Sequence, residues 1–521
     1  MAMQKSKGME LNEQFVRALR IMEETDRHCF ITGRAGTGKS TLLQHFRKTT
    51  KKEIAVLAPT GVAAVNVKGQ TIHSFFGFRP DITPDKVKAI SPRDKTLFRK
   101  LKAIVIDEIS MVRADLLDCM DIFLRIYGKK KLLPFGGVQM IFIGDLYQLP
   151  PVVTSREKSY FSLHYRSPYF FDSEVFAEGL EMEFVELEKV YRQRDEGFLT
   201  LLNAIRNNTA TDEEIAEINR RYFPDFRDEV GLAITLTTTN DLAEVINTER
   251  LSGLKGKEHR YQGRVEGDFE RKDLPTGLEI TVKKGAQVML LTNDPEGWWV
   301  NGSIGRVLSI EKRKDEPDRI RVELPEGDQV DILPHTWEMF EFHYQKEEKR
   351  VASEVVGRFT QYPLKLAWAV TIHKSQGLTF DRAVIDIGRG TFSHGQLYVA
   401  LSRCTSLDGI VLRKPIMKKH ILMDRRVVEF VTRYQYKQAR ALQPLEERIS
   451  LIEQAIREKK ELDILYLKTK DEKSRRMIRP SFVGEMEYSG RKFRGLRGFC
   501  LTRMEERVFH LDRILEMKIK G

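Results

Sequence analysis

The stretch Phe30-Ile31-Thr32-Gly33-Arg34-Ala35-Gly36-Thr37-Gly38-Lys39-Ser40-Thr41 decides the fold of this chain. Its apolar start predicts a buried strand, and the spacing of Leu42, Leu43 and Phe46 after it predicts a helix. Between strand and helix lies the pattern G-x-x-x-x-G-K-[ST], whose glycines let backbone N–H groups turn toward phosphate oxygens. The N-terminus of the helix adds partial positive charge. The sequence therefore predicts a site for a nucleoside triphosphate.

The residues of this loop have predicted roles. Lys39 is expected to reach the β- and γ-phosphates, and the Ser40 hydroxyl to bind Mg²⁺. The remaining predicted loop contacts are Gly36, Thr37, Gly38 and Thr41. Upstream, the amide of Gln14 carries both a donor and an acceptor and can pair with an adenine edge. Gln14 can equally be a solvated residue at the start of a helix, and its spacing alone does not decide between these alternatives.

Two carboxylates follow a second apolar run, Ala103-Ile104-Val105-Ile106. Asp107 is suited to holding Mg²⁺ and Glu108 to orienting the attacking water, which are the two tasks that phosphoryl transfer needs. Gln148 follows a third strand and is expected to contact the γ-phosphate and the water. Strands that alternate with helices favour a parallel α/β sheet.

Polar and aromatic residues follow other predicted strands, where ligands of parallel sheets bind. Thr60, His73 and Phe75 suit a phosphodiester backbone and stacked bases. A histidine in such a place is as often a satisfied core residue, so this alternative stays open for His73. A second set with the same character is Thr371, His373 and Ser375.

The second half of the chain contains another α/β block, with strands predicted at 234–240 and 383–386. Between them, residues 253–357 have short alternating strands and Gly/Asp/Pro turns, which predict a small inserted β-barrel. Arg403 follows an apolar helix and has the form of an arginine finger, although an isolated arginine is usually a surface ion pair.

Composition limits the class of partner. The chain has 521 residues, a net charge of +12 and a pI of about 9.3, which favours a polyanion such as nucleic acid. No apolar run reaches the roughly 18 residues of a membrane span, and the N-terminal residues do not have the pattern of a signal peptide. Four single cysteines argue against a zinc site and fit a reduced, cytosolic setting.

Together these stretches resemble a superfamily-one DNA helicase of the petite-integration-frequency (PIF) type over about residues 11 to 415. The segments that resemble its motifs are Gly33–Thr41, Ala58–Ala64 with Thr71–Phe75, Ile106–Met111, Pro134–Gln139, Gly144–Pro151, Val190–Gln193, Val300–Gly302, Ala369–Gly377 and Tyr398–Arg403. One small departure is Tyr147, which stands where the family often has Phe.

The resemblance implies two RecA-like domains with ATP between them and single-stranded DNA across their tops. It implies that Arg192 and Arg403 act as arginine fingers, that Gly377 senses the γ-phosphate and that Gln14 contacts adenine. ATP and Mg²⁺ are the implied cofactors. The expected domains are 1–185 (with a small insertion at about 79–100), 186–252 with 358–436, an SH3-like barrel at 253–357, a linker helix at 437–460 and a tail domain at 461–521.

The tail, about 447 to 521, resembles a WYL domain, a small β-rich SH3-like fold. Arg507–Ile514 matches its closing segment, whereas Arg494-Gly495-Leu496 replaces the tripeptide that names the family. Residues 461–521 hold 15 Lys and Arg against 10 Asp and Glu, a net charge of 15 − 10 = +5. Such domains bind nucleic acid or a small effector, and the candidate contacts are Arg494, Arg497, Arg507 and Arg513.

The predicted function is that of an ATP-dependent 5′–3′ DNA helicase that translocates on single-stranded DNA and unwinds duplexes in replication, repair or recombination. G-quadruplexes and RNA–DNA hybrids are further candidate substrates, and the tail is expected to be an accessory DNA-binding or regulatory domain. The expected partners are single-stranded DNA and a duplex or fork, with no membrane, for a monomer that can dimerise on DNA. The expected location is the cytoplasm of a bacterium, at the nucleoid. Two alternatives remain open, namely a nucleic-acid or effector sensor switched by its ATPase, and an RNA translocase.

Overall fold

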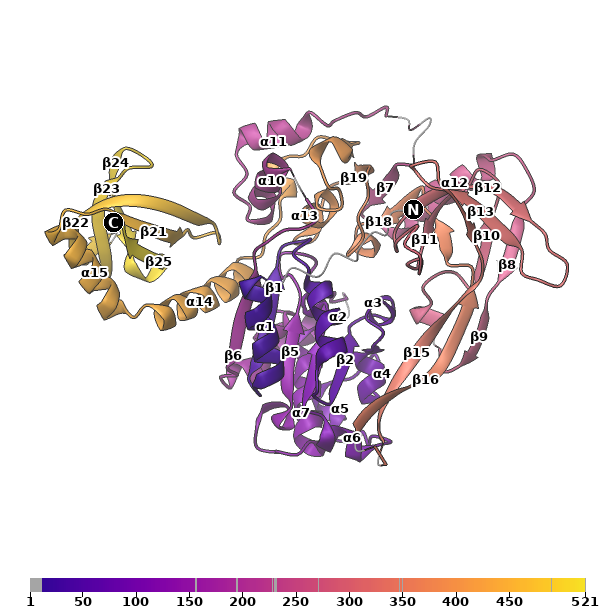
Figure 1. The fold of residues 1–521 in the computed structure, drawn as a ribbon, viewed down its shortest axis with the longest axis horizontal. Coiled ribbons are helices and arrows are strands. Elements are labelled where there is room, and N and C mark those ends of the chain that lie inside the picture. Colours follow the sequence, from indigo (N-terminus) through magenta and orange to yellow (C-terminus); the bar gives the residue numbers. More distant parts are fainter. Residues whose placement is uncertain are drawn as a thin grey trace, which may run out of the picture. The chain divides into compact units, whose positions relative to one another are not determined.

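A computed structural model describes residues 12–154, 157–193, 195–226, 228, 232–269, 271–345, 347–348, 350–488 and 490–520. The chain forms two compact units. The first runs to Arg206 and from Ala210 to Leu422, and the second combines Asn207–Thr209 with the chain from Met423 onward (Figure 1). In the part of the chain that the structure describes, no helix is both long and apolar enough to cross a membrane.

The first unit begins with a six-stranded sheet in which every neighbouring pair is parallel. The strand order is β3-β2-β4-β5-β1-β6, and the bounds are β1 His28–Gly33, β2 Ile54–Ala58, β3 Gln70–Thr71, β4 Ala103–Ile106, β5 Gln139–Ile143 and β6 Met182–Leu187. The accompanying helices are α1 Glu13–Glu24, α2 Lys39–Thr49, α3 Gly61–Asn66, α4 Ile72–Phe76, α5 Pro84–Val87, α6 Lys95–Lys100, α7 Ala114–Tyr127, α8 Lys158–His164 and α9 Glu174–Ala177. The predicted parallel α/β class is confirmed.

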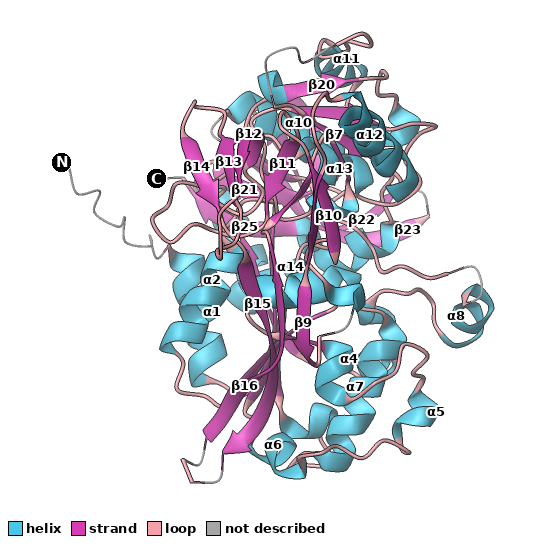
Figure 2. Cartoon of the chain, turned by 90° about the vertical axis from the view of Figure 1, so that its right-hand side faces the viewer, coloured by secondary structure: helices cyan, strands magenta, loops and turns pink. Residues whose placement is uncertain are grey.

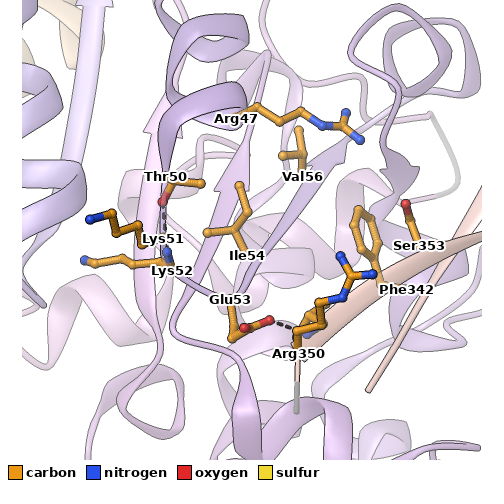
Figure 3. Close-up of a pocket in the computed structure, with 11 residues that line it drawn as sticks. Arg47, Thr50, Lys51, Lys52, Glu53, Ile54, Val56, Phe342, Arg350 and Ser353 are labelled. Atoms are coloured by element: carbon orange, nitrogen blue, oxygen red, sulfur yellow. Dashed lines mark hydrogen bonds between the residues drawn. The ribbon is translucent and has the colours of Figure 1, made fainter. Parts of the chain in front are cut away.

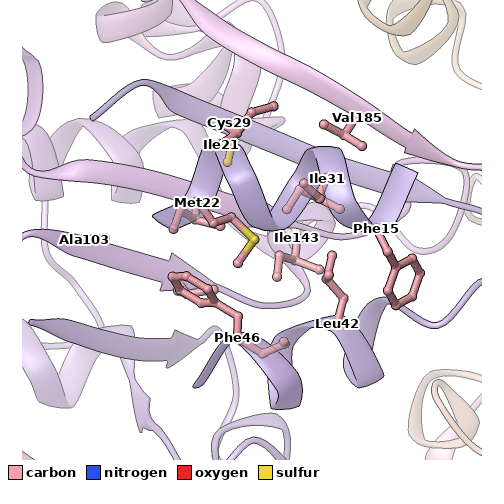
Figure 4. Packing of buried hydrophobic residues seen from close by; sticks show 14 of the residues in the cluster. Phe15, Ile21, Met22, Cys29, Ile31, Leu42, Phe46, Ala103, Ile143 and Val185 are labelled. Carbon is pink, nitrogen blue, oxygen red and sulfur yellow. The ribbon is translucent and has the colours of Figure 1, made fainter. Parts of the chain in front are cut away.

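The packing of α1 and α2 on this sheet fixes the phosphate loop between β1 and α2. Phe15 and Met22 of α1 and Leu42 and Phe46 of α2 are buried together with strand residues such as Ile31 (Figure 4). The side chain of Asn12 caps α1 by accepting a hydrogen bond from the Phe15 N–H at 2.9 Å. The loop therefore starts and ends on elements held by one apolar core.

A second parallel sheet in the same unit has the order β18-β7-β19-β20. Its strands are β7 Ile234–Thr237, β18 Ala369–Thr371, β19 Ala383–Asp386 and β20 Ile410–Leu412, and its helices are α10 Glu196–Arg206, α11 Asp212–Asn219, α12 Asn240–Gly253 and α13 Gln396–Leu401. The chain leaves this sheet after β7 and α12 and returns to it at β18. A second α/β block interrupted by an insertion was the sequence prediction.

The insertion consists of antiparallel strands in three small sheets, ordered β10-β8, β14-β13-β12-β11-β17 and β15-β16-β9. Their bounds are β8 His259–Gln262, β9 Arg264–Gly267, β10 Glu279–Val282, β11 Gln287–Leu290, β12 Ile304–Glu311, β13 Arg319–Glu323, β14 Gln329–Ile332, β15 His335–Gln345, β16 Arg350–Gln361 and β17 Leu364–Leu366. The long β15–β16 ribbon is prominent in Figure 2 and was not predicted.

The ribbon reaches the first sheet. Phe342 N–H donates to Gln70 Oε1 at 3.4 Å, and Tyr344 N–H donates to Asp94 Oδ2 at 2.9 Å. A cavity lies where the ribbon meets the start of β2, and Figure 3 shows the basic side chains that line it. Its lining is Arg47, Thr50, Lys51, Lys52, Glu53, Ile54, Val56, Phe342, Arg350, Val351 and Ser353, and it contains no predicted site residue.

The described residues of the second unit form two α-helices and a five-stranded antiparallel sheet of order β24-β23-β22-β21-β25. The elements are α14 Arg425–Leu442, α15 Leu445–Arg457, β21 Leu462–Leu467, β22 Lys473–Tyr488, β23 Arg491–Cys500, β24 Glu505–His510 and β25 Ile514–Ile519. Ile452 and Ala455 of α15 are buried with Ile464 and Leu496 of the sheet, so this unit has an apolar core of its own.

All four cysteines, Cys29, Cys119, Cys404 and Cys500, are buried and form no disulfide. Burial raises the pKa of Cys29 and of Cys404 to about 12, and it also raises the pKa of Cys119. Since the thiolate is the reactive form of cysteine, we expect these three thiols to be unreactive.

Candidate functional site

The phosphate loop has the backbone that its glycines predict. Gly36 and Gly38 have φ angles of +81° and +86°, a region that residues with a Cβ rarely adopt. A Cβ on Gly36 would lie 2.5 Å from Arg192 Cβ, and Tyr191 N–H donates to Gly36 O at 2.8 Å. The predicted arginine-finger segment therefore lies directly on the phosphate loop.

Lys39 turns back into the loop. Its amine donates to Gly33 O at 2.7 Å and to Arg34 O at 3.1 Å. Burial lowers the pKa of Lys39, and the charges of nearby carboxylates, Asp145 first among them, oppose that shift. Thr37 is buried and donates to Arg34 O, whereas Ser40 and Thr41 are exposed at the start of α2. Gln14 is half-buried in the first turn of α1.

The two acids at the end of β4 lie close to Lys39, and all three residues are half-buried. Glu108 has a left-handed backbone, with φ +52° and ψ +44°, and its N–H donates to Asp107 Oδ1 at 3.0 Å. Burial raises the pKa of Asp107, and burial together with the charge of Asp107 raises the pKa of Glu108 to about 7. A carboxylic acid that titrates near neutral pH is suited to act as a general base.

The donor set fits the way a protein holds Mg²⁺ with a nucleotide. Within the described ranges, no three His, Cys, Asp or Glu side chains gather as a metal site of their own. Mg²⁺ in phosphoryl-transfer sites usually takes one or two protein oxygens and completes its shell with phosphates and water. The exposed hydroxyl of Ser40 and the carboxylate of Asp107 would suffice for this arrangement.

Gln376 joins Glu108 to Gln148, and Gln376 was not predicted from the sequence. Its amide nitrogen donates to Glu108 Oε2 at 3.0 Å and to Gln148 Oε1 at 3.0 Å. The signal in the sequence was its position immediately before Gly377, a residue that was predicted. Gly377 itself has φ +83°, and its carbonyl accepts from the Arg192 guanidinium at 3.1 Å.

The two predicted arginines differ in their surroundings. Arg192 is partly exposed and contacts the carbonyls of Gly377 and Ser402. Arg403 is only 1% exposed, so it is not the surface ion pair considered above. It donates to Val399 O, Ser375 O, Leu378 O and Ser402 Oγ. Burial and the charge of Arg192 lower the pKa of Arg403 to about 9.

Several contacts join the two parallel sheets around this cluster. Ala35 N–H in the phosphate loop donates to the Tyr398 hydroxyl at 3.0 Å. The His394 Nε2 to Leu146 O distance is 2.9 Å. The Arg206 guanidinium lies 3.7 Å from the centre of the Tyr147 ring. The loop that carries Gln148 is thus contacted by residues from helices and loops that accompany the second sheet.

The predicted contacts to a polynucleotide differ in accessibility. Thr60 is exposed and caps α3, and His73 and His373 are half-buried. The Thr371 hydroxyl accepts from Lys374 N–H at 3.3 Å, and the Ser375 hydroxyl donates to Ile372 O at 2.8 Å. Both hydroxyls are therefore engaged within their own segment.

The predicted stacking role of Phe75 is corrected by the burial of its ring. The Phe75 side chain is 7% exposed, and its ring packs against Phe76, Phe98 and Phe342 at centroid distances of 4.9, 5.3 and 6.0 Å. This aromatic cluster covers the ring, so Phe75 offers no free face to a base. Its apolar neighbours are contributed by α4, α6 and the β15–β16 ribbon, which are distant in the sequence.

The four tail arginines do not gather in one place. Arg497 lies opposite Phe482 and Val508 in the sheet, with its guanidinium 5.8 Å from the Phe482 ring centre. Arg494 and Arg507 have the opposite strand parity and point to the other face. Arg513 lies in the short turn after β24. Phe493 and His510, which stack at 3.8 Å, were not predicted.

Comparison with known proteins finds relatives of both parts of the chain. Residues 11–215 match the PIF1-like helicase family, and residues 447–519 match the WYL domain. The ATP-dependent DNA helicase Pif1 of Bdellovibrio bacteriovorus is 31% identical over 439 residues, 82% of this chain and 93% of that protein. ATP-dependent DNA helicase PIF1 of Xenopus laevis is 34% identical over 394 residues, and the match covers 74% of this chain but only 58% of the relative's length.

Solved structures of Bacteroides Pif1 are also similar. The complex with ADP-AlF4 is 34% identical, covers 82% of this chain and 98% of that one, and has a TM-score of 0.74. The complex with single-stranded DNA is 35% identical with the same coverage and a TM-score of 0.58. From the shared core, the phosphate loop and these matches, we conclude that the chain belongs to the PIF1-like helicase family.

Proposed function

We propose that this chain is an ATP-driven DNA helicase that moves 5′ to 3′ along a single strand. The observation that carries the proposal is the partly buried cluster in which Lys39, Glu108 and Gln148 from one sheet meet Gln376 and Arg403 from the other. Relatives named as ATP-dependent DNA helicases support this proposal, as does a relative crystallised with ADP-AlF4 and with single-stranded DNA.

In this proposal the phosphate loop binds the triphosphate through its backbone N–H groups, and Lys39 exchanges its two carbonyl partners for phosphate oxygens. Ser40 and Asp107 would hold Mg²⁺, which would neutralise phosphate charge when bound. Glu108 accepts the proton of the attacking water, and Gln148 and Gly377 respond to the γ-phosphate. Arg192 and Arg403 neutralise the charge that develops during transfer.

Hydrolysis would be turned into movement through the contacts that join the two sheets. Loss of the γ-phosphate weakens the nucleotide-dependent contacts, so the two sheets can separate and close again in each cycle. We propose that Thr60, His73, Thr371, His373 and Ser375 border the strand. The hydroxyls of Thr371 and Ser375 already form hydrogen bonds within their own segment, so these two residues would contact the strand through their backbone. Grip on phosphates should weaken with salt, with a log–log slope of about −0.7 per phosphate.

Replacing Lys39 with alanine tests the assignment. DNA-stimulated ATP turnover should fall by about 10²- to 10³-fold, the usual effect of removing one preorganised charge from a reacting phosphoryl group. Phosphate release with and without single-stranded DNA measures it. Lys51→Ala is the control, because this exposed lysine lies in the cavity of Figure 3 and away from the loop. Unchanged turnover in Lys39→Ala would end the helicase proposal.

The second unit supports a different candidate, in which a nucleic-acid or effector sensor controls the ATPase. Its independent core and its match to the WYL domain favour a separable module. We expect removal of residues 447–521 to leave unwinding within a few-fold and to lower DNA affinity or regulation, measured on a forked duplex. If the shortened chain hydrolyses ATP but does not unwind, the sensor proposal replaces the proposal that the second unit is an accessory DNA-binding or regulatory domain of a helicase.

The finer substrate choices are part of the proposal. A strand of DNA should stimulate ATP turnover more than RNA of the same sequence, and the reverse would favour an RNA translocase. Forks, G-quadruplexes and RNA–DNA hybrids are the structures that we propose the chain unwinds. Two copies on one fork are the proposed assembly, since a similar Pif1 structure is described as two coordinating helicases on forked DNA. A role in DNA replication, repair or recombination, at the nucleoid of a bacterium, is also part of the proposal.

A further inference from the structure

Phe392 is an exposed aromatic residue that neither the motifs nor the family resemblance singled out. It lies in the loop between β19 and α13, and 63% of its surface is exposed. Its ring is nearly parallel to that of His373, with an interplanar angle of 17° and a centroid distance of 6.4 Å. An exposed phenylalanine alone needs no explanation, but one aligned with a proposed strand contact is a candidate for stacking.

The loop holds Phe392 in a fixed place. The Phe392 N–H donates to Gln396 Oε1 at 3.1 Å, and Gln396 is fully buried. The neighbouring Thr391 hydroxyl donates to His420 O at 2.7 Å. The ring is therefore presented to solvent from an anchored backbone, so binding a base to it would cost little ordering of the loop.

The same loop touches the nucleotide side of the molecule. Two residues after Phe392, His394 contacts Leu146 O, and a Cβ on Gly395 would lie 2.3 Å from Gln148 O. Gln148 in turn accepts from Gln376, which also donates to Glu108. A displacement of the Gln148 loop would therefore change the contacts of His394 and Gly395, which are two and three residues after Phe392.

We propose that Phe392 is a nucleobase-stacking residue, and that the loop of residues 387–395 links stacking on the single strand to the position of Gln148. The base would lie against the exposed face of the Phe392 ring and extend the parallel pair with His373. Every base has a π-face, so the contact is tolerant of sequence, as a translocating protein requires. This inference rests on the proposed helicase function.

Three substitutions at Phe392 separate stacking from packing. Phe392→Ala removes the ring, Phe392→Leu keeps apolar bulk without a ring, and Phe392→Tyr keeps the ring. Each is titrated with an oligothymidylate that carries one 2-aminopurine, whose fluorescence is quenched when it stacks. We expect Ala and Leu to weaken binding about tenfold, as loss of one base–aromatic stack implies, and to lose quenching at one position of the label, while Tyr retains both.

Phe223→Ala is the matched control, because Phe223 is 44% exposed in the same unit and contacts none of the site residues named here among the described contacts. It should bind as the unaltered chain does. Unchanged binding and quenching in Phe392→Ala, or full recovery by Leu, would overturn the stacking proposal while leaving the helicase proposal intact. Failure of the unaltered chain to bind the strand would instead count against the proposed function.

Discussion

Replacing Arg192 with alanine should lower DNA-stimulated ATP turnover by about 10³- to 10⁵-fold, the effect of losing an arginine finger in related phosphoryl transfers. Arg192 is the better exposed of the two arginines, and its segment is attached to the phosphate loop through the Tyr191 N–H bond to Gly36 O. To reach a bound phosphate, its guanidinium gives up two carbonyl contacts, whereas Arg403 must leave four acceptors.

Steady-state phosphate release measures the Arg192 effect, and Arg220→Ala is its control. Arg220 is an exposed arginine that pairs with Glu217 on the surface, so its loss should change turnover little. Arg192→Lys should recover only part of the rate, because lysine keeps the charge but not the planar fork. Turnover within tenfold of the unaltered chain in Arg192→Ala would contradict the finger assignment.

Glu108→Gln should reduce ATP turnover by about 10²- to 10⁴-fold, the usual contribution of a general base. In the unaltered chain, kcat/KM for ATP should depend on pH with a midpoint near 7, because the pKa of Glu108 is raised to about 7. Below that pH the acid is protonated and cannot accept a proton, so kcat/KM falls as pH falls. Above it the carboxylate is ionised and kcat/KM levels off.

Gln376 offers an independent check on this base. Its N–H donates to the Glu108 carboxylate, and a donor to the ionised form stabilises that form. Gln376→Ala should therefore move the midpoint of the kcat/KM profile to higher pH, together with a loss of rate. A profile with no inflection between pH 6 and 8, or one unchanged by Glu108→Gln, would exclude Glu108 as the base.

The parts of the site that the sequence predicted are those fixed by local geometry. A strand, three glycines and a Lys-Ser pair determine the phosphate loop within twelve residues, and an apolar strand determines where Asp107 and Glu108 emerge. The parallel α/β class followed from the same alternation of apolar strands with helices. These features need no knowledge of what packs against them.

The parts that were missed depend on contacts between distant segments. Phe75 was read as a stacking residue because nothing near it in the sequence shows that α6 and the β15–β16 ribbon cover it. The ribbon itself was missed because much of it is half-buried or exposed on both faces, so its apolar alternation is weak. The role of Gln376 could not be predicted, because it depends on how the two sheets place its amide between Glu108 and Gln148.

The seclusion of every native thiol makes this chain convenient for fluorescence work. A maleimide dye attacks thiolates that solvent can reach, and Cys29, Cys119, Cys404 and Cys500 are all inside the fold. One new cysteine placed on α11 and another on α3 should thus accept a donor and an acceptor dye without prior removal of the natural ones. Distance changes between the two sheets during turnover could then be followed on single molecules of otherwise unaltered sequence.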